Sequence, residues 1–192
     1  EAAFESGVLG RKPNDQADDI DQEESEVLRC EVLDVLLSHG ANANQRNQNG
    51  RSFLFRAVDM TRSGVIAVLL KHGADANITD EEGNTALHEA SRDGKEDCAK
   101  QLMLGGANPN CRDKKSKVPF MELFCGSSPP SVQIAKWLIA YGADLAVTTN
   151  AGKSIKNYAK RALRKASDEG GDTDACETII AMLRNPDALS DY

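Results

Sequence analysis

Apolar residues recur along this chain in short stripes of helical spacing, separated by polar turns that contain glycine. The segment 80–110 carries two such stripes: Ala86, Leu87 and Ala90, then Cys98, Ala99, Leu102 and Met103. Because each stripe covers only one face of a helix, the segment predicts two short amphipathic helices that pack against other elements. Thr85 is a suitable N-cap for the first helix, and Gly94 can end it in the left-handed conformation.

The same pattern returns at a fixed interval. Three successive second helices are followed by a glycine, and these glycines are 33 residues apart: Gly40, Gly73 and Gly106. The turn glycines Gly50 and Gly83 are also 33 residues apart, and Ser116 stands at the next such position. A constant period of this length is the signature of a solenoid, in which each unit buries its apolar face against its neighbours.

The repeated residues resemble a known family. The sequence TALHEA at 85–90 resembles the T-P-L-H-x-A signature of ankyrin repeats, and LLSHGANAN, LLKHGADAN, LMLGGANPN and LIAYGADLA resemble the ends of four such units. The resemblance implies an all-α ankyrin-repeat solenoid of about five helix-turn-helix units with short β-hairpin tips. A single domain is expected, with units at 1–46, 47–79, 80–112, 113–148 and 149–186 and a frayed tail at 187–192.

Unit one is the least regular copy. Residues 1–10 place Ala2, Ala3, Phe4 and Val8 where an inner helix could face the stack. Residues 12–25 carry six Asp or Glu and little apolar surface to offset the entropy of ordering, so they predict an acidic, mobile insertion. This insertion is either a solvated loop or an attractive surface for a basic segment. The outer helix should run from 26 to 39, with an apolar stripe of Val27, Val32, Leu33, Leu36 and Leu37.

Units two and four depart from the signature at a few positions. Phe53 and Phe55 replace the proline and histidine of the signature in unit two, and Phe55 either packs against a neighbouring unit or stands exposed in a groove. Thr61 and Ser116 replace turn glycines, and we expect a looser tip at Ser116. A longer turn at 126–130 precedes the helix 132–141, in which Trp137 should stack between units four and five.

Unit five suits a terminal cap. Its inner helix should continue to about Ala166, and it puts Lys156 where the signature has leucine. Many exposed cations give this helix the water-compatible face that the end of a solenoid needs. A flexible acidic turn at 168–174 and a last helix at 174–184 should follow.

Composition and charge narrow the classes of function. The chain has 192 residues, 40% of them hydrophobic and 5% aromatic, which suits one domain with aliphatic packing. A net charge of −7 argues against direct nucleic-acid binding. Five cysteines without a C-x-x-C pair fit reduced thiols better than disulfides or zinc.

The start of the chain and the length of its apolar runs indicate where in the cell the protein is expected. No apolar run approaches the roughly 20 residues of a membrane span, and the start has no secretory pattern, so we expect a soluble, intracellular protein, cytoplasmic or nuclear. Because the chain begins with Glu1 in a helix-like segment, we expect it to be a piece of a larger protein and monomeric in isolation.

We find no arrangement of residues that predicts catalysis. The phosphate-binding loop, the nucleophile elbow and the zinc-protease motif are missing from the sequence, and we expect no enzyme activity, no cofactor and no metal site. His39 and His72 occupy equivalent places and resemble the helix-end histidines of the family. For His88 the resemblance implies a ring that bonds to local backbone and ties neighbouring turns together.

The resemblance also implies a binding groove made by the tips and the exposed ends of the inner helices. The candidate groove residues are Arg51, Phe55, Asp59, Met60, Glu81, Glu82, Asn84, Arg92, Asp93, Lys114, Lys115, Lys117 and Lys153, with Gln48, Asn49 and Arg161 beside them. Their charge changes from an acidic middle to a basic C-terminal half. Either this suits an extended peptide that is basic at one end and acidic or phosphorylated at the other, or it only keeps the stack in solution.

Three functions follow as hypotheses. The first is a non-catalytic module that binds a protein or peptide, one with a basic segment included, in its groove. The second is a targeting or regulatory arm of a larger enzyme or channel. The third is an acidic groove that reads basic histone tails.

Overall fold

The computed structural model of the chain describes residues 17–184, with side chains from residue 26 onward. This part is helical, with no β-strand in the described range. Its helices are α1 (Ala17–Ser38), α2 (Phe53–Asp59), α3 (Ser63–Lys71), α4 (Ala86–Arg92), α5 (Glu96–Leu104), α6 (Pro119–Glu122), α7 (Val132–Ala140), α8 (Ile155–Asp168) and α9 (Asp174–Met182). Between residues 17 and 184, no helix is both long and apolar enough to cross a bilayer.

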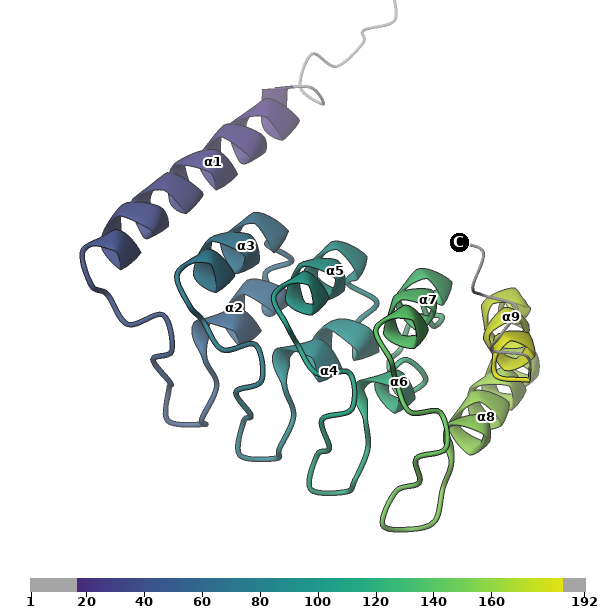
Figure 1. Cartoon of the computed structure of the whole chain (residues 1–192). Coiled ribbons are helices and arrows are strands. Elements are labelled where there is room, and N and C mark those ends of the chain that lie inside the picture. The colour runs from purple at the N-terminus through teal and green to yellow at the C-terminus, as the bar shows by residue number, and fades with distance from the viewer. Residues whose placement is uncertain (1–16, 185–192) are drawn as a thin grey trace, which may run out of the picture.

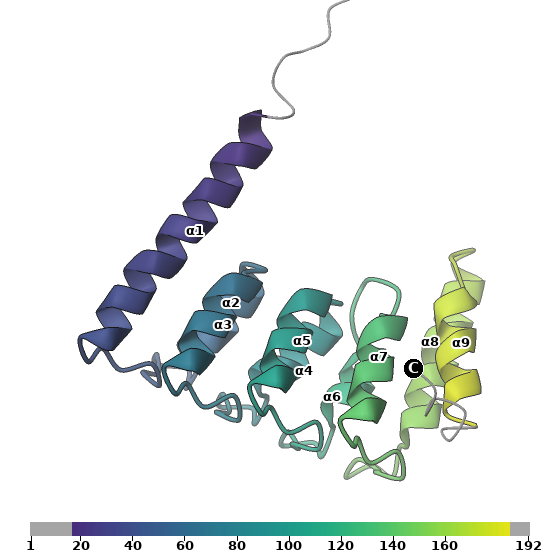
Figure 2. The same cartoon turned by 45° about the horizontal axis from the view of Figure 1, so that its top comes forward.

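The helices lie in two parallel rows (Figures 1 and 2). The inner row is α2, α4, α6 and α8, and the outer row is α1, α3, α5, α7 and α9; each helix contacts the next one in its row. The described part thus contains four helix pairs, preceded by α1. The predicted inner helix of unit one, at 1–10, lies outside the described residues, so a count of five units stays a prediction.

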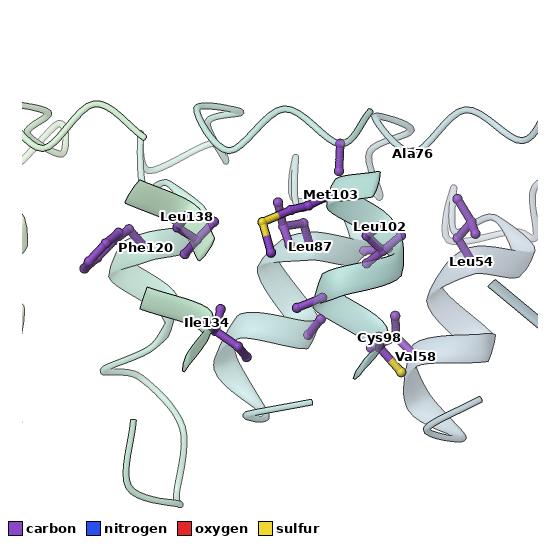
Figure 3. Close-up of a cluster of buried hydrophobic side chains, with 14 of the residues drawn as sticks. Leu54, Val58, Ala76, Leu87, Cys98, Leu102, Met103, Phe120, Ile134 and Leu138 are labelled. Atoms are coloured by element: carbon purple, nitrogen blue, oxygen red, sulfur yellow. The ribbon is translucent and has the colours of Figure 1, made fainter. Parts of the chain in front are cut away.

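A continuous apolar core runs between the two rows (Figure 3). All seven stripe residues predicted for the segment 80–110 are at most 2% exposed: Ala86, Leu87, Ala90, Cys98, Ala99, Leu102 and Met103. Phe120, Ile134 and Leu138 continue this core into unit four (Figure 3). Each side chain packs between adjacent units, which is the packing that the 33-residue period predicts.

The local signals of helix ends are confirmed. Thr85 and His88 form a reciprocal capping box at the start of α4. Gly83 and Gly94 adopt φ values of 84° and 67°, in the left-handed region that glycine enters without steric cost. Thr61 has φ 55° and so takes the role of Gly94 in unit two, although its side chain is β-branched.

The tips are turns closed by single bridges rather than by strands. The bridges pair Arg46 with Ser52, Thr79 with Thr85, and Thr148 with Ser154. The tip at 113–117 has no such bridge. It still keeps the turn, because Ser116 has φ 58° and its N–H donates to the carbonyl of Asp113 at 2.9 Å. The backbone at Ser116 is therefore strained, and the turn keeps its shape. The expected looser tip is seen only as the missing bridge between the two sides of the turn.

A ladder of asparagines joins successive units and was not foreseen from the sequence. Nδ2 of Asn44, Asn77 and Asn110 donates to the carbonyl of the glycine that follows the outer helix of the next unit: Gly73, Gly106 and Gly142, at 3.0, 3.2 and 2.9 Å. Each Oδ1 also accepts from a backbone N–H of that unit at 2.7 Å. The ladder fixes the spacing of the loops that lead to the tips.

Helix α1 differs from the prediction in its start. It begins at Ala17 instead of Glu26, so 17–25 is helical and the predicted mobile insertion is wrong there; residues 12–16 lie outside the described residues. The physical reason is that Gln and Glu have good helix propensity, and acidic residues are favoured near a helix N-terminus. The low apolar content of the segment does not prevent a helix that continues an already stable one.

The apolar stripe of α1 is only partly buried, contrary to expectation. Leu37 is buried and Leu33 packs against the core, whereas Val27, Val32 and Leu36 are more than half exposed. Within the described residues α1 contacts α3 on one side. Its other side faces no described element, and for this reason three of the five stripe residues stay exposed.

The C-terminal half contains the elements expected for units four and five. Pro119 opens α6, the Ser131 hydroxyl caps α7 by accepting from Ile134 N at 3.1 Å, and the last two helices have nearly the predicted bounds. Trp137 was expected between units four and five. Lys100 Nζ of α5 lies 5.9 Å from the centroid of the Trp137 ring, so one face of the indole is turned toward unit three, and its stacking against unit five stays a prediction.

Candidate interaction groove

The tips of units two to five form one continuous row at the edge of the stack (Figure 1). Backbone hydrogen bonds connect them: Glu81 N donates to Asn49 O at 3.2 Å, Lys114 N to Glu82 O at 2.9 Å, and Asn150 N to Lys115 O at 3.1 Å. The row therefore holds the candidate tip residues at fixed spacing. The inner helices α2, α4, α6 and α8 begin directly behind it.

Charged side chains on this row project into solvent. Glu81, Glu82, Lys114, Lys115 and Lys153 are exposed, as are Gln48 and Asn49. Within the described residues these five charges take part in no ion pair. Asn84 differs from them, because its amide is half-buried and donates to Asp80 at 3.3 Å, which holds the turn.

The inner helices carry a charge network that neutralises itself. Arg51 pairs with Glu89 and lies 3.5 Å from Asp59, and Arg92 donates to Glu89 at 2.9 Å. Glu89 therefore lies between two guanidinium groups from units two and three. Burial raises the pKa of the Glu89 carboxyl, and the charges of Arg51 and Arg92 act against this.

Glu89 was missing from the sequence-based set. The sequence did offer a signal, because Glu89 occupies the variable x position of the T-P-L-H-x-A signature, one helical turn before Arg92. The network cancels the charges of Arg51, Asp59 and Arg92, so the free acidic charge in the middle of the groove is that of the tip residues Glu81 and Glu82.

Phe55 is corrected as a groove residue. Its side chain is 1% exposed and belongs to the core, and the guanidinium of Arg51 lies 4.9 Å above its ring. It occupies the register of His88, which is also 1% exposed, since 88 − 55 is the repeat length of 33. That position points into the next unit and is covered by it. The exposed aromatic of α2 is Phe53, at 48% exposure.

The ends of the inner helices supply the remaining candidates. Met60 is 46% exposed beside Thr61, and Asp93 lies 3.4 Å from Arg92 and 3.8 Å from Lys95. Both residues thus lie at the far margin of the inner helices from the tips. Asp93 is tied to its own unit, whereas Met60 offers open apolar surface.

In unit four the groove cation is already paired. Lys117 forms an ion pair with Glu122, a carboxylate that is 3% exposed. Burial lowers the pKa of Lys117, but the hydrogen bond to Glu122 and the nearby negative charges of Glu122 and Asp113 together outweigh this, and the net pKa is raised. Lys117 is therefore a structural cation.

Unit five presents uncompensated cations on its inner helix. Arg161 and Lys165 are exposed on α8, and the described residues give neither of them an ion pair. Tyr158 lies one turn before Arg161 and is half-buried. Lys165 and Tyr158 were not among the sequence candidates.

The histidines have structural partners. His88 Nδ1 accepts from Thr85 N at 3.0 Å, and its Nε2 lies 3.3 Å from the carbonyl of Lys117, which confirms the local bond and the tie between turns. His39 bonds to the carbonyl of Val35 and His72 to Asp34. Among the side chains described from residue 26 to residue 184, no group of three or more His, Cys, Asp or Glu is arranged to hold a metal ion.

The cysteines are free thiols. Burial raises the pKa of Cys98 to about 11, so this thiol stays protonated at neutral pH. Burial also raises the pKa of Cys125, at the end of the unit-four inner helix. Neither thiol has the lowered pKa of an activated nucleophile.

Comparison with known proteins agrees with this architecture. A family model described as ankyrin repeats (3 copies) matches residues 26–113, which include most of α1 and the whole of α2 to α5. A search of curated proteins gave no significant match. Beyond residue 113 the paired helices and tips continue through α9. Residues 26–113 therefore consist of ankyrin repeats, and the helix pairs beyond residue 113 continue the same stack.

Proposed function

We propose that this chain is a non-catalytic interaction module that binds an extended segment of another protein along the row of tips and the inner helices. Ankyrin repeats generally mediate protein–protein interaction, and their domains are typically non-catalytic. The proposal for this chain extends that general role to a particular surface.

One observation carries the proposal: the distribution of unpaired charge. Arg51, Asp59, Glu89 and Arg92 neutralise one another, as do Lys117 and Glu122. In the described residues the tip charges Glu81, Glu82, Lys114, Lys115 and Lys153 have no such partners. A rigid row of free charges, acidic toward unit three and basic toward unit five, can fix the direction in which a charged peptide binds.

The experiment is affinity purification from cell extract with the chain as bait, compared between matched variants. Reversal of the acidic tip in Glu81→Lys/Glu82→Lys should lose partners that carry a basic segment, and Lys114→Glu/Lys153→Glu should lose those with an acidic one. The control, Asp97→Lys/Glu177→Lys, reverses two charges on the outer helices α5 and α9. A partner that all three variants retain equally, with unchanged affinity by calorimetry, would show that the tips do not bind it.

The histone-tail hypothesis is less well supported by this charge distribution. It requires a row of free carboxylates in the groove, whereas Glu89 and Glu122 are engaged by Arg51, Arg92 and Lys117. A pull-down with histone peptides tests it directly. The hypothesis of a targeting or regulatory arm requires a catalytic or channel domain in the same polypeptide. A search of the gene's full coding sequence for such a domain tests it.

A further inference from the structure

A small pocket lies between the inner helices of units four and five. Its walls are Phe124, Cys125 and Gly126 after α6, and Tyr158, Arg161, Ala162 and Lys165 on α8. Its volume is about 200 Å³. This is space for one side chain of a bound segment rather than for a folded domain.

The lining of this pocket has cations but no anion. Arg161 and Lys165 contribute two positive charges, and none of the lining residues is a carboxylate. The nearby Glu122 is 3% exposed and already paired with Lys117. Lys165 also borders a second depression that contains Glu169 and Asp172. Arg161 lines the first pocket, which contains no carboxylate, and does not line the second depression.

The repeat register explains why Arg161 is unpaired. Arg92 in unit three pairs with Glu89, three residues before it on the same helix. Arg161 occupies the same register in unit five, because 161 − 92 = 69 equals one repeat of 33 and one of 36. Three residues before Arg161 stands Tyr158 instead of a carboxylate. Unit five thus keeps the arginine of unit three and has lost its internal anion.

We propose that an anionic side chain of the bound peptide enters this pocket and pairs with Arg161, supported by Lys165, in the place that Glu89 takes beside Arg92. This inference rests on the proposed function, since it names the chemistry of one position in the bound segment. The rings of Tyr158 and Phe124 form apolar walls that lower the local dielectric and strengthen the ion pair.

Tyr158 contributes a neutral donor to the same pocket. Burial raises the pKa of its phenol above the ordinary value of 10.0, so the hydroxyl is protonated at neutral pH. A guanidinium, an ammonium and a phenol together can donate several hydrogen bonds to one anion. This chemistry fits the carboxylate of Asp or Glu and also the phosphate of phosphoserine.

The test is selection of random 12-residue peptides displayed on phage against the intact chain and its variants. We expect enriched peptides to share an acidic residue at one position. Arg161→Glu should remove that preference or replace it with Lys or Arg at the same position. The control is Lys156→Glu, because Lys156 is exposed on α8 but does not line the pocket.

Synthetic versions of an enriched peptide then identify the anion. Replacement of the shared acid by Gln should weaken binding about tenfold or more, the usual loss when a charge-assisted hydrogen bond is removed. If the Glu and phosphoserine peptides both bind more tightly than the Gln peptide, the pocket recognises negative charge. The peptide with the higher affinity of these two then identifies the preferred anion.

The outcomes separate this inference from the proposed function. Enriched peptides without a shared acidic position, or with one that Arg161→Glu leaves unchanged, would overturn the inference while leaving groove binding intact. Peptides that bind no better than the unselected library would count against both. A variant that fails to fold is recognised by its circular dichroism spectrum, and Arg161→Gln then replaces Arg161→Glu in the same selection.

Discussion

The side chain of Asn77 joins its unit to the next through both of its polar atoms: Nδ2 donates to the carbonyl of Gly106 at 3.2 Å, and Oδ1 accepts from Asn108 N at 2.7 Å. The same pair of bonds is made by Asn44 and by Asn110. The spacing between units is thus fixed by hydrogen bonds at the surface as well as by apolar contact in the core.

We expect Asn77→Ala to lower the free energy of unfolding by about 1–2 kcal/mol, because two inter-unit hydrogen bonds are lost. Urea denaturation followed by circular dichroism measures this loss. The control is Asn49→Ala on the adjacent tip, where the exposed side chain should contribute less than about 0.5 kcal/mol. Equal stability of the two variants would show that the ladder contributes little.

The buried pair of Lys117 and Glu122 gives a second prediction. Lys117→Met leaves a carboxylate that is 3% exposed without its cation, which should cost about 3 kcal/mol or more. The double variant Lys117→Met/Glu122→Met should be more stable than the single one, because no buried charge is left uncompensated. Urea denaturation of both, with Lys114→Met as an exposed control, measures the difference. A double variant less stable than Lys117→Met would contradict this account.

Stability should depend on the protonation of His88. Burial lowers the pKa of its imidazole, and the hydrogen bond to the Lys117 carbonyl only partly opposes this. The unfolded chain therefore takes up a proton near the ordinary pKa of 6.5 that the folded chain does not. The free energy of unfolding should be greatest above pH 6.5 and should fall as the pH drops below this value. The fall should end below the pKa that His88 has in the folded chain, where both states bind the proton.

The measurement for His88 is the free energy of unfolding at about pH 7.5 and pH 6.0 in three proteins. The unmodified chain and His39→Gln should lose stability between these values, and His88→Gln should lose less. His39 is the control because its ring is exposed and bonds within its own helix. The same loss in all three proteins would rule out His88 as the cause.

In the part of the chain that the structure describes, two residues other than glycine occupy the left-handed region: Thr61 with φ 55° and Ser116 with φ 58°. We expect Thr61→Gly to stabilise the chain by about 0.5–1 kcal/mol through relief of backbone strain. Ser116→Gly should gain less, because it also removes the 2.6 Å hydrogen bond from Ser116 Oγ to Asn150 Oδ1. Thermal unfolding of the two variants compares them directly, and a larger gain at Ser116 would contradict the role assigned to that bond.

Local features of the stack could be predicted from particular residues. Gly83 and Gly94 marked a turn and a helix end because glycine enters the left-handed region at little cost, and both do so. Thr85 marked a cap because a hydroxyl placed before a helix can accept a free N–H, and it forms the capping box of α4. These signals depend on a few neighbouring residues, so the sequence contains them in full.

The candidate groove was harder to predict because it combines residues that are far apart in the sequence. The Arg51 and Glu89 side chains are 38 residues apart, and only stacking of units two and three brings them together. Phe55 could have faced the groove or the core, and its burial depends on how unit three covers α2. The length of α1 was also missed, since a helix can extend through acidic residues when the rest of it is already stable.

The sequence by itself determined the repeat, its period and the helices with their caps, because backbone geometry and apolar spacing are local properties. Only the tertiary structure decided which charges neutralise one another and which stay free. Glu89 is neutralised because the units stack at a spacing that brings Arg51 and Arg92 to either side of it. Arg161 is left free because no carboxylate occupies the equivalent place in unit five.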